Sequence, residues 1–214
     1  MRLRRKPYIK EAIKEYQNFT FLAGSDLTAK KGKWQQEFAT HQPLMVELGT
    51  GKGSFISGMA AAFPEYNFIG IEKEPDVLFG ACKKVAAAVV PNVRLLVFNV
   101  EELATIFAPG EISGIYLNFS DPWPKVRHAK RRLTHRRFLE VYRTLLASGG
   151  KIYFKTDNRS LFDFSLEEFQ ALDCKIEELT YDLHSENTFN IMTEYEARFS
   201  ALGQKINRCV VSFK

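Results

Sequence analysis

The chain has 214 residues, 45% of them hydrophobic and 26% charged, which suits one α/β domain with a substantial core. It contains no apolar run near the roughly 20 residues that a membrane span requires, and no apolar stretch typical of a signal peptide. Its three cysteines are far apart, which argues against a disulfide framework or a cysteine-based zinc site. We therefore expect a cytoplasmic protein that uses neither a metal nor a membrane.

The net charge of +5 is concentrated in two basic segments. Residues 2–14 contain six Lys or Arg against one acid, and residues 122–139 contain seven and no acid. Such clusters in a chain of nearly balanced charge favour a polyanionic partner such as a nucleic acid. The alternative is a pair of solvated surfaces without a partner.

Strand and helix patterns alternate from residue 44 onward. Strands are expected at 44–48, 67–72, 93–99, 112–118, 151–156, 174–181 and 205–213, and helices at 54–63, 75–89, 134–146, 160–172 and 193–202. This order predicts an α/β, Rossmann-like fold with helices on both faces of a mostly parallel sheet of about seven strands, closed by an antiparallel terminal strand. Residues 1–40 lack clear strand signals and are expected to form a basic arm or cap on a domain spanning 41–214.

A glycine-rich loop follows the first of these strands. Gly49, Gly51 and Gly53 have neither the spacing of a dinucleotide fingerprint nor that of a phosphate-binding P-loop. Glu47 stands where a diphosphate would be repelled, and Glu72 ends the next strand, where an acid can accept ribose hydroxyls. A ligand with an ammonium, a sulfonium and no phosphate fits both acids, and S-adenosylmethionine (AdoMet) is such a ligand.

Three further strand ends carry polar residues on the side of a parallel sheet where ligands bind. Asn99 is either an adenine contact or an ordinary turn residue. Asp121 lies between the fourth strand and Pro122-Trp123-Pro124, where two prolines can hold a carboxylate and an aromatic ring still. Asp157 is either a ligand contact or part of a helix N-cap.

Four segments together resemble the bacterial tRNA (guanine-N7-)-methyltransferases: 46–53, 69–72, 118–125 and 193–196. The resemblance runs from about residue 15 to the end, and its most specific part is Asp121-Pro-Trp-Pro-Lys125 followed by His128-Ala-Lys-Arg-Arg132. It implies a class I AdoMet-dependent methyltransferase that methylates the variable-loop guanine of tRNA, position 46 in the family's terms. Asn99 is a departure, because many relatives have Asp there.

The resemblance also implies the roles of particular residues. Cofactor contacts are expected from Glu47, Glu72, Asn99 and Asp121, together with the glycine loop. Substrate contacts are expected from Lys125, Asp157, Thr193, Glu194, Tyr195 and Glu196, and RNA contacts from Arg127, His128, Lys130, Arg131 and Arg132. Lys125 contacts either guanine O6 or a phosphate, and Thr193 with Glu196 also has the spacing of a helix capping box.

The chemistry is consistent with this expectation, because guanine N7 has a free lone pair and needs no general base. Asp121 is the candidate to stabilise the positive charge that develops on the purine. Two alternatives stay open: methylation of an exocyclic amine in RNA, and an RNA-binding relative without catalysis. The sequence does not decide between a monomer and a homodimer.

Overall fold

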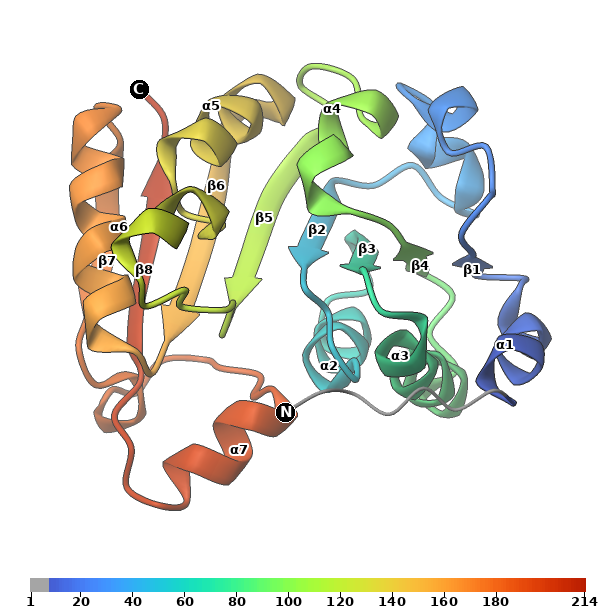
Figure 1. Cartoon of the computed structure of the whole chain (residues 1–214). Helices are drawn as coiled ribbons and strands as arrows, with labels where there is room; N and C mark the ends of the chain where they lie inside the picture. The colour runs from blue at the N-terminus through green and yellow to red at the C-terminus, as the bar shows by residue number, and fades with distance from the viewer. Residues whose placement is uncertain (1–7) are drawn as a thin grey trace.

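The computed structural model describes residues 8–214, so the basic residues of the first seven positions lie outside it. One sheet of eight strands runs through the molecule in the order β1-β4-β3-β2-β5-β6-β8-β7 (Figure 1). The strands are β1 Thr20–Phe21, β2 Leu44–Leu48, β3 Asn67–Glu72, β4 Val93–Val97, β5 Ile112–Asn118, β6 Leu146–Thr156, β7 Lys175–Thr180 and β8 Asn207–Ser212. The pairs from β1 to β6 are parallel, and β8 inserts antiparallel between β6 and β7.

Helices cover both faces of the sheet (Figure 1). The α-helices are α1 Ile9–Ala12, α2 Ser54–Ala62, α3 Pro75–Ala88, α4 Leu103–Ile106, α5 Arg136–Leu145, α6 Arg159–Ala171 and α7 Glu194–Ser200. Short 3-10 helices are η1 Ile13–Tyr16, η2 Thr28–Lys30, η3 Trp34–Glu37, η4 Val100–Glu102, η5 Val126–Arg131 and η6 Leu183–Ser185. None of the helices within residues 8–214 is long and apolar enough to cross a bilayer.

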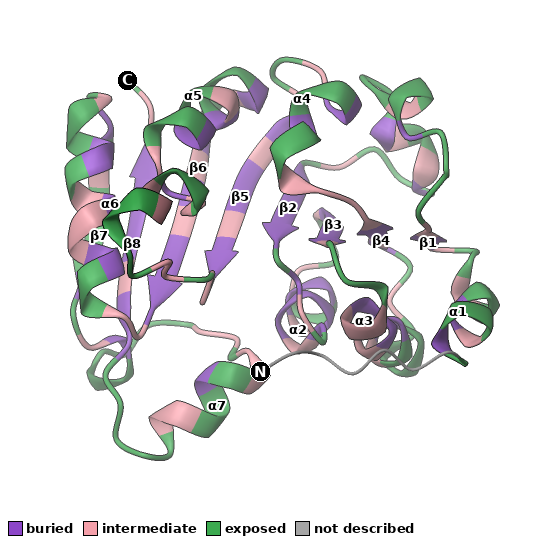
Figure 2. Ribbon diagram, in the orientation of Figure 1, coloured by how far each residue is buried: buried purple, intermediate pink, exposed green. Residues whose placement is uncertain are grey.

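The core divides into two clusters because successive side chains of a strand point to opposite faces. On β2, Val46 and Leu48 pack in the cluster that includes residues of α5 and α6, whereas Met45 packs in the cluster that includes residues of α2 and α3. The central strands are buried along almost their whole length, and the helices expose one side (Figure 2). This arrangement confirms the predicted α/β, Rossmann-like fold with its antiparallel terminal strand.

Two expectations about the elements require correction. The sheet has eight strands rather than about seven, because Thr20 and Phe21 pair in parallel with Leu95 and Leu96 at its edge. A strand of two residues is too short to show an alternating pattern in the sequence. The expected helix over 134–146 is shorter, because Leu146 leaves it to pair with Ile112 and begin β6.

Residues 8–40 are packed closely against the sheet and its helices. Trp34 has no exposed surface, and its ring nitrogen donates a hydrogen bond of 2.8 Å to the carbonyl of Ile106. Ile9 and Ile13 are also buried, in the cluster that contains α3. A boundary at residue 40 remains a prediction, and residues 8–40 contribute to both parts of the core.

Candidate active site at the carboxyl edge of the sheet

The glycine loop connects the end of β2 to the start of α2. Gly49, Gly51 and Gly53 all have positive φ, at 81°, 61° and 82°. Gly53 is also confined sterically, since a Cβ there would lie 2.6 Å from Ala81 on α3. Only glycine meets both conditions, so the loop can turn sharply and leave its backbone open to a ligand.

Glu72, at the end of β3, is tied to this loop. One carboxylate oxygen accepts the backbone N–H of Gly51 at 3.1 Å, and the other accepts those of Lys73 and Glu74 at 2.8 and 3.1 Å. A carboxylate offers about four acceptor positions, and these bonds occupy three of them. Glu72 therefore shapes the loop and retains limited capacity for a ligand hydroxyl.

Glu47 is almost completely buried on the face of β2 that points toward α2. Its Oε1 accepts a hydrogen bond of 2.8 Å from the amide of Asn118 on β5, whereas its Oε2 is buried without a partner among the described residues. Burial raises the pKa of Glu47 from 4.5 to about 8. An unsatisfied carboxylate oxygen at this position fits an ammonium, which is the group that AdoMet would present there.

Asn99 follows β4 and caps the 3-10 helix η4. Its Oδ1 accepts the N–H of Glu101 at 3.2 Å, which is the turn role considered from the sequence. Its amide nitrogen lies 3.4 Å from Glu102. The adenine contact expected for Asn99 stays a prediction.

The segment after β5 has unusual backbone geometry. Phe119 and Trp123 have positive φ values of 50° and 41°, which are rare for residues with side chains. Arg132 holds this loop, because its guanidinium donates hydrogen bonds to the carbonyls of Pro122 and Trp123 at 3.0 and 3.2 Å. Strained backbone held by such bonds is characteristic of functional sites. Asp121 is exposed at the centre of this loop and makes no hydrogen bond or ion pair with any described residue.

The predicted RNA-binding residues divide into two groups. Arg127, Lys130 and Arg131 are exposed in η5, with Arg131 stacked over the ring of Trp123 at 4.8 Å. Lys125, which was predicted as a substrate contact, is exposed beside them. His128 meets the Trp123 ring edge-on. Arg132 is half-buried, bonds the loop and stacks on Phe164 at 4.3 Å, so it serves the shape of the site.

The segment 193–196 begins α7 and is joined to the site by three of its side chains. Thr193 and Glu196 form the capping box expected from the sequence. Tyr195 donates a hydrogen bond of 3.0 Å to Asp157, and its ring packs 5.2 Å from that of Phe119. Glu194 pairs with Lys84 of α3.

Glu196 has no exposed surface and forms an ion pair of 2.6 Å with Lys155 of β6, whose side chain is only 5% exposed. Sequence reasoning missed Lys155. No local signal distinguishes it, because β6 carries a second lysine, Lys151, whose side chain is 40% exposed.

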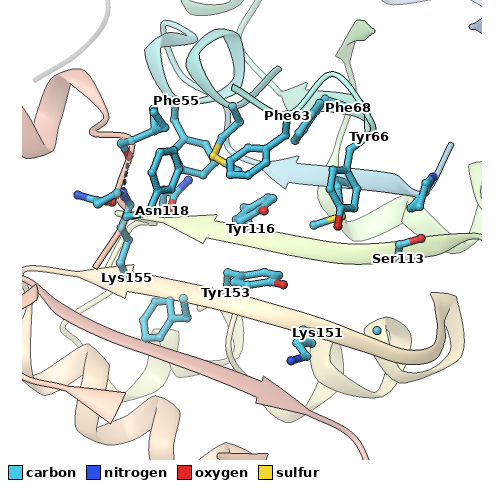
Figure 3. Close-up of a pocket in the computed structure, with 18 of the residues that line it drawn as sticks. Phe55, Phe63, Tyr66, Phe68, Ser113, Tyr116, Asn118, Lys151, Tyr153 and Lys155 are labelled. Carbon is cyan, nitrogen blue, oxygen red and sulfur yellow. Dashed lines mark hydrogen bonds between the residues drawn. The ribbon is translucent and has the colours of Figure 1, made fainter. Parts of the chain in front are cut away.

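A cavity of about 550 Å³ opens beside this ion pair (Figure 3). Its floor includes the stacked rings of Tyr116 and Tyr153, which are 4.7 Å apart, and Asn118 and Lys155 lie at one end. Among residues 8–214 there is no group of three or more metal-ligating side chains, and the three cysteines are buried and unpaired.

Comparison with known proteins identifies the family. A family model described as "Putative methyltransferase" matches residues 41–209. The tRNA (guanine-N(7)-)-methyltransferase of Geobacillus sp. (strain WCH70) is 48% identical, covering 100% of this chain and 96% of the relative. The enzyme of the same name from Bacillus subtilis (strain 168) is 46% identical and covers both chains completely.

Solved structures agree at the level of the fold. An antibiotic-related methyltransferase superposes with a TM-score of 0.61 at 20% identity, covering 84% of this chain and 92% of the other. A 16S rRNA methyltransferase, KamB, gives 0.62 at 10% identity, with coverages of 84% and 91%. At such low identity, these two structures support the fold alone. The assignment to a family rests on the two full-length relatives. The chain belongs to the tRNA (guanine-N(7)-)-methyltransferase family.

Proposed function

We propose that this protein transfers a methyl group from AdoMet to N7 of a guanine in the variable loop of tRNA and so forms 7-methylguanosine. The observation that carries the proposal is the buried oxygen of Glu47, which has no partner among residues 8–214, next to a glycine loop whose spacing is neither that of a dinucleotide fingerprint nor that of a P-loop. Beside it lies the loop held by Arg132, which carries the carboxylate of Asp121, without a partner among residues 8–214, and a row of exposed cations. Membership of the family supports the choice of tRNA as substrate.

The cofactor would be held by the ends of the first strands. Glu47 would receive its ammonium, the backbone of Gly49 and Gly51 would pass close to it, and Glu72 would use its remaining capacity for a ribose hydroxyl. Asn99 would complete the pocket at the adenine edge. When bound, AdoMet supplies an electrophilic methyl group on a positively charged sulfur.

The transfer requires alignment and charge stabilisation, and no proton needs to be removed. The lone pair of guanine N7 would accept the methyl group that bound AdoMet supplies, which would leave neutral S-adenosylhomocysteine and a positively charged purine. Asp121 would stabilise the charge on the purine, since no residue in the described part of the chain competes for its carboxylate. The hydrogen bonds from Arg132 to the carbonyls of Pro122 and Trp123 would keep Asp121 in position.

The exposed cations would bind the tRNA backbone. Arg127, Lys130 and Arg131 can neutralise phosphates, so binding should weaken steeply with salt. Lys125 would contact either a phosphate or guanine O6. The ring of Trp123 offers a surface on which the displaced guanine would stack. The guanidinium of Arg131 lies over that ring, so it would either move away or stack on the opposite face when the guanine binds.

The segment 193–196 and Asp157 would complete the guanine pocket. Tyr195 is exposed and Asp157 is half-buried, so both would be accessible to a substrate, whereas Glu196 is fully buried and would act through the position of its neighbours. A tRNA substrate also implies a cytoplasmic location.

The proposal can be tested with two tRNA transcripts that differ in one atom. One carries guanine in the variable loop, and the other carries 7-deazaguanine, which has carbon in place of N7. We expect methyl incorporation from labelled AdoMet into the first transcript alone. Equal incorporation into both would point to an exocyclic amine, and incorporation into neither, with intact cofactor binding, to an RNA-binding protein without catalysis.

A further inference from the structure

Lys155 occupies an unusual position for a lysine, between the cofactor side and the substrate side of the proposed site. It lies on β6 with its side chain 5% exposed. Its ammonium donates hydrogen bonds to Glu196 Oε2 at 2.6 Å, to Asn190 Oδ1 at 2.9 Å and to the carbonyl of Ile191 at 2.9 Å. All three donors are therefore used: two partners, Asn190 and Ile191, belong to the segment that leads into α7, and the third, Glu196, belongs to its first turn.

This segment depends on Lys155 for its shape. Residues 186–193 form no helix or strand, so side-chain bonds must fix their course. Glu196 also accepts a bond of 2.6 Å from Asn190 and lies 3.3 Å from His184. Without Lys155, the completely buried carboxylate of Glu196 would lose its main counter-charge.

The same ammonium faces the cofactor side. Asn118 pairs in register with Lys155 on the neighbouring strand, and the Asn118 amide is hydrogen-bonded to Glu47 on the next strand. Figure 3 shows Asn118 and Lys155 together at one end of the cavity. Burial raises the pKa of Glu47, the charge of Lys155 opposes that effect, and the charge of Glu194 adds to it.

We propose that Lys155 is a positioning residue that couples the two halves of the site, because one ammonium holds segment 190–196 and faces the carboxylate that receives the cofactor. This inference rests on the proposed function. An ionised Glu47 gives Lys155 a second carboxylate to face, and an ordered Lys155 fixes the segment from which Tyr195 reaches Asp157. Cofactor binding should then order the guanine pocket, and each ligand should favour the other.

A pH experiment must separate the effect of Lys155 on the pKa of Glu47 from the effects of the other groups near Glu47. Asn118 donates a hydrogen bond to its carboxylate, and the Thr50 hydroxyl beside it donates to the Glu47 backbone carbonyl. Lys155 is the cation that lowers its pKa, and Glu194 is the acid that raises it. Glu194 is itself paired with Lys84. Of the groups that affect Glu47, Lys155 is the cation whose removal should shift the pH dependence of cofactor binding upward.

The first test measures the affinity for S-adenosylhomocysteine, which has the same ammonium, by calorimetry from about pH 6 to pH 9. Lys155→Met should move the midpoint of this profile upward by roughly half a pH unit or more. Because Lys155→Met leaves Glu196 buried and unpaired, the double variant Lys155→Met/Glu196→Gln is measured in parallel. Glutamine preserves the capping box and removes the stranded charge.

Lys151→Met provides the matched control. Lys151 lies four residues earlier on the same face of β6, at the other end of the cavity, and is paired with Glu177 at 2.5 Å (Figure 3). The midpoint of the pH profile of Lys151→Met should match that of the wild type. If the midpoints of both Lys155 variants also match, Lys155 has a structural role only and the inference is overturned.

The second test follows hydrogen exchange in residues 186–196 with and without S-adenosylhomocysteine. The wild type and Lys151→Met should gain protection there on binding, and the double variant should bind without that gain. Equal gains in all three proteins would overturn the coupling while leaving the proposed function intact. A wild type that binds neither S-adenosylhomocysteine nor AdoMet would overturn both.

Discussion

Replacing Glu47 with glutamine should stabilise the cofactor-free protein at neutral and alkaline pH while weakening cofactor binding. The side chain is buried, and its pKa is raised from 4.5 to about 8. A carboxyl group with a raised pKa stabilises the fold fully below pH 4.5, and this contribution is lost as the pH rises through 8. Glutamine carries no such penalty at any pH.

The magnitude follows from the shift. One pKa unit corresponds to about 1.4 kcal/mol, so between about pH 5.5 and pH 7.5 the wild type should lose about 2–3 kcal/mol relative to Glu47→Gln. For a chain of this size, that corresponds to a change of roughly 5–10 °C in the difference between the two melting temperatures. The glutamine amide also lacks an acceptor, since Oε2 of Glu47 has no partner, but this cost is the same at both pH values.

The assay is thermal unfolding of both proteins at the two pH values without cofactor, then with saturating AdoMet. Other titrating groups are common to both proteins and cancel in the difference. The reasoning would be refuted if the two melting temperatures differed equally at both pH values. With AdoMet, the wild type should gain much more stability than the variant, because only Glu47 offers a charge to the ammonium.

Three further predictions separate the parts of the site. Asp121→Ala should lower single-turnover methyl transfer at least about tenfold while tRNA affinity in filter binding is preserved, and near-normal transfer would remove Asp121 from the mechanism. Arg131→Met should weaken tRNA binding and reduce its salt slope by about 1, whereas Arg132→Met should mainly lower the rate of transfer; identical effects would contradict their separate roles. Gly53→Ala should destabilise the fold by about 1–3 kcal/mol more than Gly203→Ala in urea unfolding, since both have positive φ (82° and 78°) but only Gly53 has a neighbour in the way of a Cβ; equal losses would exclude the clash.

The sequence was informative where a feature is local. The alternation of strands and helices predicted the fold, and the glycine loop is followed by a helix as its spacing required. The capping box of Thr193 and Glu196 also depends on residues three apart. Such features can be read from a short window because their geometry is fixed by neighbouring residues.

Features that depend on distant partners were not predictable. Lys155 is paired with Glu196, 41 positions further along the chain, and no local pattern marks either residue as buried. Arg132 lies in a basic run, so it was assigned to RNA, yet its guanidinium bonds carbonyls nine and ten residues earlier. Glu72 was interpreted as a ribose contact, and its hold on the backbone of Gly51 became visible only in three dimensions.

The central claim is that the methyl group reaches N7 of guanine in tRNA. It is tested most directly by nucleoside mass spectrometry of unmodified tRNA incubated with the protein and AdoMet, followed by mapping of the modified position. The account predicts 7-methylguanosine at one site in the variable loop, and none when AdoMet is omitted. A methylated exocyclic amine, or tRNA that remains unmodified by a protein shown to bind AdoMet, would contradict it.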